Sequence, residues 1–141
     1  MDAETIPDLD APISPGVSSA GILIGTTVEA LLASTHPLAS SGERFGFHRF
    51  PSVKVWSTEG TVRMVGVSEG YRGLVDGRIG VGSSLQDVED WCAGKVDRGK
   101  YNTLIATGRA GLSFITERWN DDQQVGIDPT DRLTAIFVHR D

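Results

Sequence analysis

Two stretches of this chain align with each other, and such a repeat constrains the fold more than any other feature of the sequence. The stretch AGILIGTTVEALL (residues 20–32) aligns with GRIGVGSSLQDVE (residues 77–89), which places Gly25 opposite Gly82. In both stretches, two hydroxyl residues and then an aliphatic residue follow the aligned glycine. The order of local patterns stays the same in the rest of each half, so the sequence predicts two repeated units.

Each half continues with three segments of strand-like length. They are FGFHRF, SVKVW and TVRMVGV in the first half, and NTLIAT, GLSFITE and LTAIFV in the second. Apolar residues alternate or cluster in every segment, and Gly, Pro, Ser or Asp separate the segments, as in antiparallel strands joined by turns. The predicted fold class is α+β. Each unit is expected to be a short helix followed by a three-stranded antiparallel meander, with the helices on one face of the sheet.

The predicted units cover residues 20–76 and 77–141 and pack together as one domain. Thr26 or Thr27 is expected to cap the first helix, and Ser84-x-x-Asp87 resembles a capping box at the start of the second. The glycine of AGK, at residues 93–95, is expected to end the second helix.

The formal net charge of −6 is unevenly distributed along the chain. Residues 1–19 contain acidic residues and no basic residue, so the sequence predicts a disordered acidic tail there. The rest has no basic run of the kind that favours nucleic-acid binding, and no stretch approaches the ~20 apolar residues of a membrane span. The first residues lack the basic and apolar regions of a secretory signal. We therefore expect a cytoplasmic protein that binds neither nucleic acid nor membrane.

The glycine-rich stretch GRIGVGSS (residues 77–84) raises the question of a phosphate-binding loop. A dinucleotide-binding loop continues to a third glycine, but Leu85 follows the serines here, and a P-loop requires a lysine that is absent. The first half keeps only Gly25 of the two glycines. We interpret the stretch as a turn glycine followed by a helix cap.

Residue types that usually bind metals or catalyse reactions form no recognisable pattern. The single cysteine, Cys92, cannot form an internal disulfide or a thiolate zinc site, and it is expected to be buried among apolar residues. The acidic loop NDDQQVGIDPTD (residues 120–131) has Val125 where an EF-hand requires glycine. No serine lies in a G-x-S-x-G motif. The histidines, none of them at metal-ligand spacing, are His36, His48 and His139.

We therefore predict no catalytic residue, no cofactor and no metal, although hydrolysis by paired acids stays open. Aromatic residues near strand ends, with charges close by, are the best candidates for a binding site, because tryptophan is enriched at interface hot spots. The alternative is that these aromatics close the ends of the core. Alternation places Lys54 and Trp56 on the face opposite to their neighbours in the strand. The candidate partner-binding residues are Lys54, Trp56, Tyr101, Trp119, Asp121 and Asp122.

The stretches IGTTVEALL and IGVGSSLQDVEDW together resemble the tandem-repeat β-lactamase inhibitor proteins and the related small outer-membrane assembly lipoproteins. The second half also resembles small bacterial immunity proteins, through its glycine turn, its DVE helix and its NTLIA and GLSF strands. The resemblance implies a non-catalytic protein that presents a sheet face or loops to a protein partner. The chain departs from these families in having no lipid-attachment cysteine near its start and no disulfide.

The expected function is that of a cytoplasmic immunity or inhibitor protein that neutralises a cognate toxin or enzyme. The acidic tail is expected to steer a basic toxin toward the protein. Two alternatives stay open. One is a scaffold or assembly module, and the other is a small-molecule binder or enzyme that uses a cavity between the repeated units.

Overall fold

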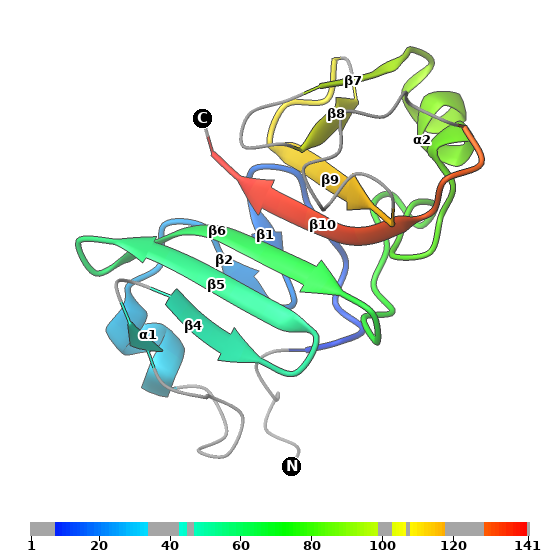
Figure 1. Cartoon of the computed structure of the whole chain (residues 1–141). Coiled ribbons are helices and arrows are strands. Elements are labelled where there is room, and N and C mark those ends of the chain that lie inside the picture. Colours follow the sequence, from blue (N-terminus) through cyan, green and yellow to red (C-terminus); the bar gives the residue numbers. More distant parts are fainter. Residues whose placement is uncertain are drawn as a thin grey trace.

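The computed structural model describes residues 8–33, 43–44, 47–98, 103–106, 108–117 and 129–140. In these ranges the chain forms one eight-stranded antiparallel sheet in the order β3-β4-β5-β6-β10-β9-β8-β7, and a separate two-stranded sheet, β1-β2 (Figure 1). The strands of the large sheet are β3 (Glu43–Arg44), β4 (Phe47–Phe50), β5 (Val53–Thr58), β6 (Thr61–Ser68), β7 (Val96–Arg98), β8 (Leu104–Ala106), β9 (Leu112–Thr116) and β10 (Leu133–His139). The other elements are β1 (Ser18–Ser19), β2 (Ile22–Leu23), α1 (Val28–Ala33) and α2 (Leu85–Cys92).

The prediction of an α+β fold made of two repeated helix-plus-meander units is wrong. Strand is the predominant secondary structure in the described residues, and α1 and α2 have only six and eight residues. The sheet is continuous because β6 and β10 pair antiparallel in its centre, from Ala135 opposite Ser68 to His139 opposite Met64. Strands β3 and β7, which the sequence pattern did not reveal, extend it at its two ends.

The aligned stretches around Gly25 and Gly82 do share one local structure. Both glycines have a φ of +98°, which favours glycine over residues that carry a Cβ. The Gly25 N–H donates to the Val62 carbonyl at 2.8 Å, and the Gly82 N–H donates to the Leu133 carbonyl at 2.9 Å. This likeness concerns the loop before each helix and the strand that the loop meets. It does not divide the sheet into two units.

Hydroxyl caps begin both helices, as predicted. The Thr27 hydroxyl accepts a hydrogen bond from the Ala30 N–H at 3.1 Å. At α2, Ser84 and Asp87 form a complete capping box, in which each side chain accepts from the other residue's N–H, at 3.1 and 3.0 Å. The C-cap of α2 is Ala93, with a left-handed φ of 53°, so the glycine beside it is not the residue that turns the chain.

One face of the large sheet packs on the hydrophobic core. Alternation along the strands produces this face, since side chains two residues apart lie on the same side. On β5, for example, Val53 and Val55 are buried, whereas Lys54 is exposed and Trp56 is half-buried. The core also includes residues of α2 and of the β1-β2 hairpin, among them Leu85, Val88 and Ile22.

Residues 8–19 are packed on the protein, so the predicted disordered tail is wrong for this part of it. Ile13 is 2% exposed, its N–H donates to the Leu74 carbonyl at 2.9 Å, and it forms a parallel bridge with Val75. A Cβ at Gly73 would lie 1.8 Å from the Ala11 carbonyl oxygen, so this close approach requires glycine. Leu9 and Ile13 are separated by Asp, Ala and Pro and do not alternate with polar residues as in a strand, which is why the sequence did not predict this packing.

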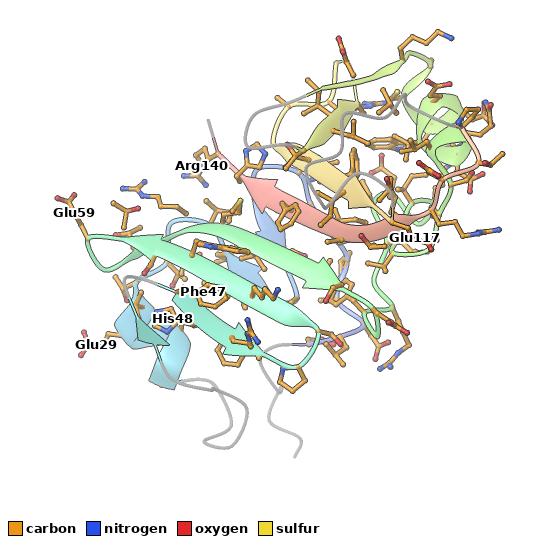
Figure 2. The ribbon with its side chains drawn as sticks, viewed as in Figure 1. Glu29, Phe47, His48, Glu59, Glu117 and Arg140 are labelled. Carbon is orange, nitrogen blue, oxygen red and sulfur yellow. The ribbon has the colours of Figure 1, made fainter. Side chains whose placement is uncertain are left out.

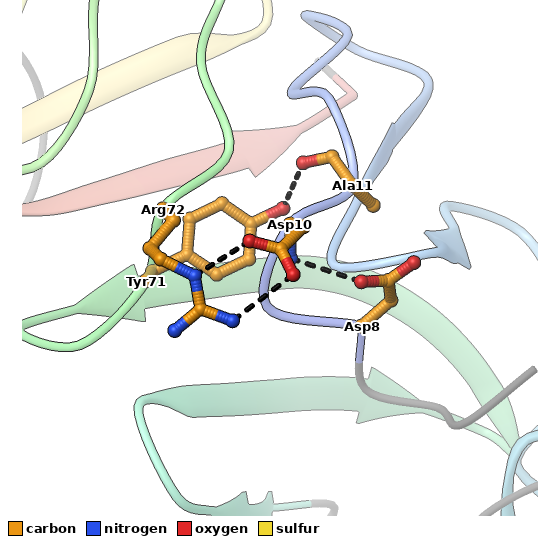
Figure 3. Close-up of polar contacts among 5 residues, drawn as sticks. All are labelled: Asp8, Asp10, Ala11, Tyr71 and Arg72. Carbon is orange, nitrogen blue, oxygen red and sulfur yellow. Dashed lines mark hydrogen bonds and ion pairs between the residues drawn. The ribbon is translucent and has the colours of Figure 1, made fainter.

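Tyr71 and Arg72 hold this N-terminal segment in place (Figure 3). The Tyr71 hydroxyl donates to the Ala11 carbonyl and accepts from the Ala20 N–H at 2.9 Å, and burial raises the pKa of this hydroxyl. Arg72 forms a bidentate ion pair with Asp10, with Nε–Oδ1 and Nη2–Oδ2 distances of 2.6 and 3.0 Å. The hydrogen bond and charge of Arg72 hold the pKa of Asp10 below its ordinary value. Asp10 therefore belongs to an internal contact.

Neither helix in the described part of the chain has the length and apolar character that crossing a membrane would require.

Candidate functional site

The face of the sheet opposite to the core presents three aromatic side chains from three strands. We call this the open face, and we call Phe47 of β4, Trp56 of β5 and Phe137 of β10 the aromatic stripe. Their common side follows from the strand register, in which Phe47 lies opposite Trp56, and Phe137 and Lys54 both lie opposite Gly66. All three rings are half-buried. Figure 2 labels Phe47, from which the open face can be followed across the sheet.

Gly66 of β6 makes room for two of these rings. A Cβ at this position would lie 2.7 and 2.8 Å from Cδ1 and Cε1 of Phe137, and 3.1 Å from Cζ3 of Trp56. These distances are shorter than ordinary carbon–carbon contacts. Because glycine has no side chain, the rings of Trp56 and Phe137 approach each other above β6, with centroids 5.9 Å apart and planes at 62°. The glycine backbone thus forms the floor beneath the stripe.

The third ring extends the cluster toward the sheet edge. The centroids of Phe47 and Trp56 are 5.3 Å apart, with an interplanar angle of 47°. The Arg49 guanidinium carbon lies 5.7 Å from the centroid of the Phe47 ring, within cation–π range. Each ring therefore packs on a neighbour, and these contacts restrict the rotamers of the stripe.

Two basic side chains adjoin the stripe. Lys54 precedes Trp56 by two residues on the same face of β5, and Arg49 lies directly opposite Lys54 on β4. Both side chains are exposed. The open face therefore carries two adjacent basic side chains beside the stripe.

The structure describes two of the six residues predicted from sequence to bind a partner. Lys54 and Trp56 lie together on the open face, on the side that alternation predicted. The remaining candidates lie outside the described residues, and they are Tyr101, Trp119, Asp121 and Asp122. Sequence reasoning missed Phe47, Gly66 and Phe137 as members of this site. The pattern of FGFHRF did not single out Phe47, and no local pattern shows that Phe137 lies opposite Gly66, 71 residues earlier in the chain.

The glycine-rich stretch forms an internal turn and not a phosphate loop. The Gly82 N–H donates to the Leu133 carbonyl at 2.9 Å, and the Gly80 N–H donates to the Ser83 hydroxyl at 3.0 Å. The Ser83 N–H returns a hydrogen bond to the Gly80 carbonyl at 3.0 Å. An anion site would need these N–H groups to be free, and Asp87 already supplies a negative charge at the start of α2.

The other residues singled out from the sequence lie apart from the open face. His48 is 1% exposed on the core side of β4, and its Nδ1 has no hydrogen-bond partner within the described residues. Cys92 is a free, half-buried thiol that packs against the core. Trp91 is buried, its Nε1–H donates to Asp76 Oδ2 at 2.9 Å, and Arg109 lies over its ring. Among the described residues, no group of three His, Cys, Asp or Glu side chains is placed to hold a metal. His36 and most of the 120–131 loop lie outside the described ranges.

The fold has a counterpart among solved structures. No protein-family model matches the chain, and no curated protein sequence matches it. The crystal structure of the uncharacterized protein yfeY from Escherichia coli is similar, with a TM-score of 0.58 and 13% sequence identity. The match covers 92% of this chain and 99% of that chain. At this identity the similarity concerns the fold alone, and the resemblance to inhibitor and immunity proteins stays a prediction.

Proposed function

We propose that this protein binds another protein through the open face and does not catalyse a reaction, as expected of an inhibitor or immunity protein. The observation that carries the proposal is the aromatic stripe, which is half-exposed on the side of the sheet away from the core. Aromatic and arginine side chains are enriched in protein interfaces, and tryptophan and arginine dominate their hot spots. The cytoplasmic location belongs to the same proposal, because a chain with one cysteine has no internal disulfide that needs an oxidising compartment.

The stripe is suited to binding because its rings are already ordered. Ring centroids 5.3 and 5.9 Å apart restrict each other's rotamers, and association then costs less side-chain entropy than it would with mobile residues. The strands beneath are fixed by continuous backbone pairing from β4 through β5 and β6 to β10. A partner would meet a rigid surface with an apolar centre and charged side chains beside it.

Affinity purification from cells of the source organism tests the proposal with three versions of the full chain. Trp56→Ala removes the middle ring of the stripe. Leu23→Ala is the matched control, because Leu23 is a 56% exposed apolar residue in the β1-β2 hairpin, outside the large sheet. The expected result is a stoichiometric partner that wild type and Leu23→Ala retain and Trp56→Ala loses, while all three stay folded by circular dichroism. A partner that all three versions retain equally would show that binding does not use the open face.

Activity assays on the captured partner separate the inhibitor reading from the scaffold alternative. An inhibitor or immunity protein should abolish the partner's activity at a one-to-one ratio. If the partner stays fully active in the complex, the protein is a scaffold or assembly module that uses the same surface.

A further inference from the structure

The sequence contains one Asp-Gly dipeptide, Asp76 and Gly77, and the fold places it in an exposed turn outside the large sheet. Both residues have a positive φ, of 53° and 68°. The Arg78 N–H closes the turn by donating to the Val75 carbonyl at 2.9 Å, and Val75 also pairs with Ile79. Asp-Gly suits such turns because both residues tolerate a positive φ. The glycine also leaves the amide nitrogen that follows the aspartate without a shielding side chain.

We propose that Asp76 is a latent isoaspartate site, which the turn and a hydrogen bond from Trp91 keep from reacting in the folded protein. In the reaction, the Gly77 nitrogen bonds to Asp76 Cγ, and the hydroxyl of the carboxyl group leaves with the amide proton as water. The product is a cyclic succinimide, which a second water molecule opens. Hydrolysis of the bond to Cγ restores aspartate, whereas hydrolysis of the original peptide bond leaves an isoaspartate whose main chain runs through Cγ.

The backbone of the turn holds the two reacting atoms apart. A residue with a Cβ and a φ of 53° lies in the left-handed region, where ψ is about +30 to +60°. This ψ places the Gly77 nitrogen on the side of the Cα–C bond away from Cβ, whereas the planar succinimide ring requires both on the same side. Asp76 must therefore rotate about its Cα–C bond before the ring can close. That rotation would break the hydrogen bond between Arg78 and Val75.

The side chain of Asp76 is held by Trp91 of α2. The Trp91 Nε1–H donates to Asp76 Oδ2 at 2.9 Å, and the indole is itself fixed, because it is buried and Arg109 lies over its ring. A buried ring cannot follow the carboxylate, so rotation of Asp76 also breaks this hydrogen bond. Succinimide formation then requires a locally open form of the turn, and its rate follows the population of that form.

Isoaspartate at position 76 would disturb the packing of the N-terminal segment. It adds one carbon atom to the main chain between Val75 and Ile79, which are paired with each other. Val75 also forms the parallel bridge with Ile13, and the Ile13 N–H donates to the Leu74 carbonyl at 2.9 Å. The modified turn would therefore loosen the strand on which this segment is packed.

Incubation of the full-length wild-type protein at 37 °C and pH 7 tests the proposal, with a synthetic peptide of residues 73–80 as the unfolded reference. Trypsin cleaves after Arg72 and Arg78, so the digest of the protein yields a peptide in which Asp76 is the only aspartate. Liquid chromatography and protein isoaspartate methyltransferase then measure isoaspartate at this position. The folded protein should form it at least about tenfold more slowly than the synthetic peptide does.

Trp91→Phe tests the hydrogen bond, because it keeps an aromatic ring beside Arg109 and removes the donor to Asp76. The rate of isoaspartate formation should rise about fivefold, as expected for the loss of one hydrogen bond to an exposed carboxylate. Ile136→Val is the matched control. It removes one methyl group from a fully buried residue of β10, outside the turn, and should leave the rate close to that of wild type. Circular dichroism checks that both variants are folded, and the comparison of wild type with the peptide needs no variant.

Several outcomes would overturn the proposal. A synthetic peptide that forms no isoaspartate would remove its chemical basis, and equal rates in peptide and folded protein would show that the turn gives no protection. An unchanged rate in Trp91→Phe, or equal increases in Trp91→Phe and Ile136→Val, would show that the hydrogen bond does not hold the site. The isomerised protein, separated by ion exchange, should also exchange its Ile13 amide hydrogen faster than fresh protein. Unchanged exchange would overturn the link to the N-terminal segment.

Discussion

The indole ring of Trp56 and the phenyl ring of Phe137 meet edge to face across strand β6, although their own strands, β5 and β10, are not neighbours in the sheet. The contact exists because the intervening residue is Gly66, whose missing side chain leaves space for both rings. One glycine thus joins two aromatic residues that are 81 positions apart in the sequence.

Gly66→Ala should break this relationship. The added methyl would lie within 2.8 Å of the Phe137 ring, so we expect the free energy of unfolding to fall by about 1–3 kcal/mol through overpacking. The rings should also move apart, which would reduce the near-ultraviolet circular dichroism of Trp56, identified by difference from Trp56→Phe. In a strand without such a contact, replacing glycine by alanine stabilises a protein by about 0.4–1 kcal/mol. An increase in stability would therefore show that the rings do not need this space.

Tyr71→Phe should loosen the N-terminal segment. The change removes the hydrogen bonds to the half-buried Ala11 carbonyl and from the buried Ala20 N–H, and a buried donor left unpaired costs about 1–3 kcal/mol. Urea denaturation at pH 8, with Asp10→Asn as a variant that changes only the exposed ion pair, measures the difference. A loss no greater than that of Asp10→Asn would contradict the role given to the Tyr71 hydroxyl.

The stability difference between wild type and Tyr71→Phe should also depend on pH. Burial raises the pKa of Tyr71 above its ordinary value of 10.0, so the folded state holds this proton more tightly than the unfolded state does. The contribution of Tyr71 to stability is complete below pH 10 and is lost as the pH rises toward the raised pKa. The stability difference between wild type and Tyr71→Phe should therefore shrink in denaturation curves recorded between pH 9 and pH 11. A constant difference over that range would rule out the raised pKa.

The capping box of α2 should behave as one unit. Ser84→Ala removes one of its two hydrogen bonds, of 3.1 and 3.0 Å, and should cost about 0.5–2 kcal/mol. Asp87→Ala removes the other bond, and because each residue positions its partner, the double variant should lose less than the sum of the two single losses. Chemical denaturation of wild type, the two single variants and the double variant gives the coupling free energy between Ser84 and Asp87. Strict additivity would mean that the two bonds act independently.

Asp76 and Trp91 form a further contact that can be tested with a conservative pair of variants. Asp76→Ala leaves the buried Trp91 indole N–H without its 2.9 Å acceptor, at a cost of about 1–3 kcal/mol. Asp76→Asn keeps an oxygen acceptor and tolerates the φ of 53° at this position, so it should retain most of the stability. Thermal unfolding of both variants measures which one loses more stability. Equal losses would indicate that the negative charge of Asp76, and not its oxygen acceptor, stabilises the protein.

Local patterns predicted what depends on neighbouring residues. The caps at Thr27 and Ser84 followed from residue type and position, and alternation placed Lys54 and Trp56 on a common face. The six predicted strand segments correspond to β4, β5, β6, β8, β9 and β10, whereas the short strands β1, β2, β3 and β7 were not predicted.

The pairing between distant strands could not be predicted in this way. Alternation tells which side of a strand a residue faces, but not which strand lies beside it. The β6–β10 pairing, and with it the whole sheet, depends on contacts between residues far apart in sequence. The aromatic stripe depends on the same pairing, because Phe137 joins Trp56 only when β10 lies next to β6. The N-terminal segment was missed for a different reason, since its packing relies on backbone contacts at Gly73 and on the Tyr71 hydroxyl rather than on a hydrophobic pattern.

The central position of β10 has a consequence for how the protein is made. A ribosome synthesises β10 after every other described strand, yet β10 is the strand that joins β6 to β9. Until it arrives, β6 and β9 each present an unpaired backbone edge, and such edges favour intermolecular pairing. Any half-sheet that forms before β10 is available would expose such an edge to other chains. Ribosome-associated chaperones should be most needed in the interval before residues 133–139 leave the exit tunnel.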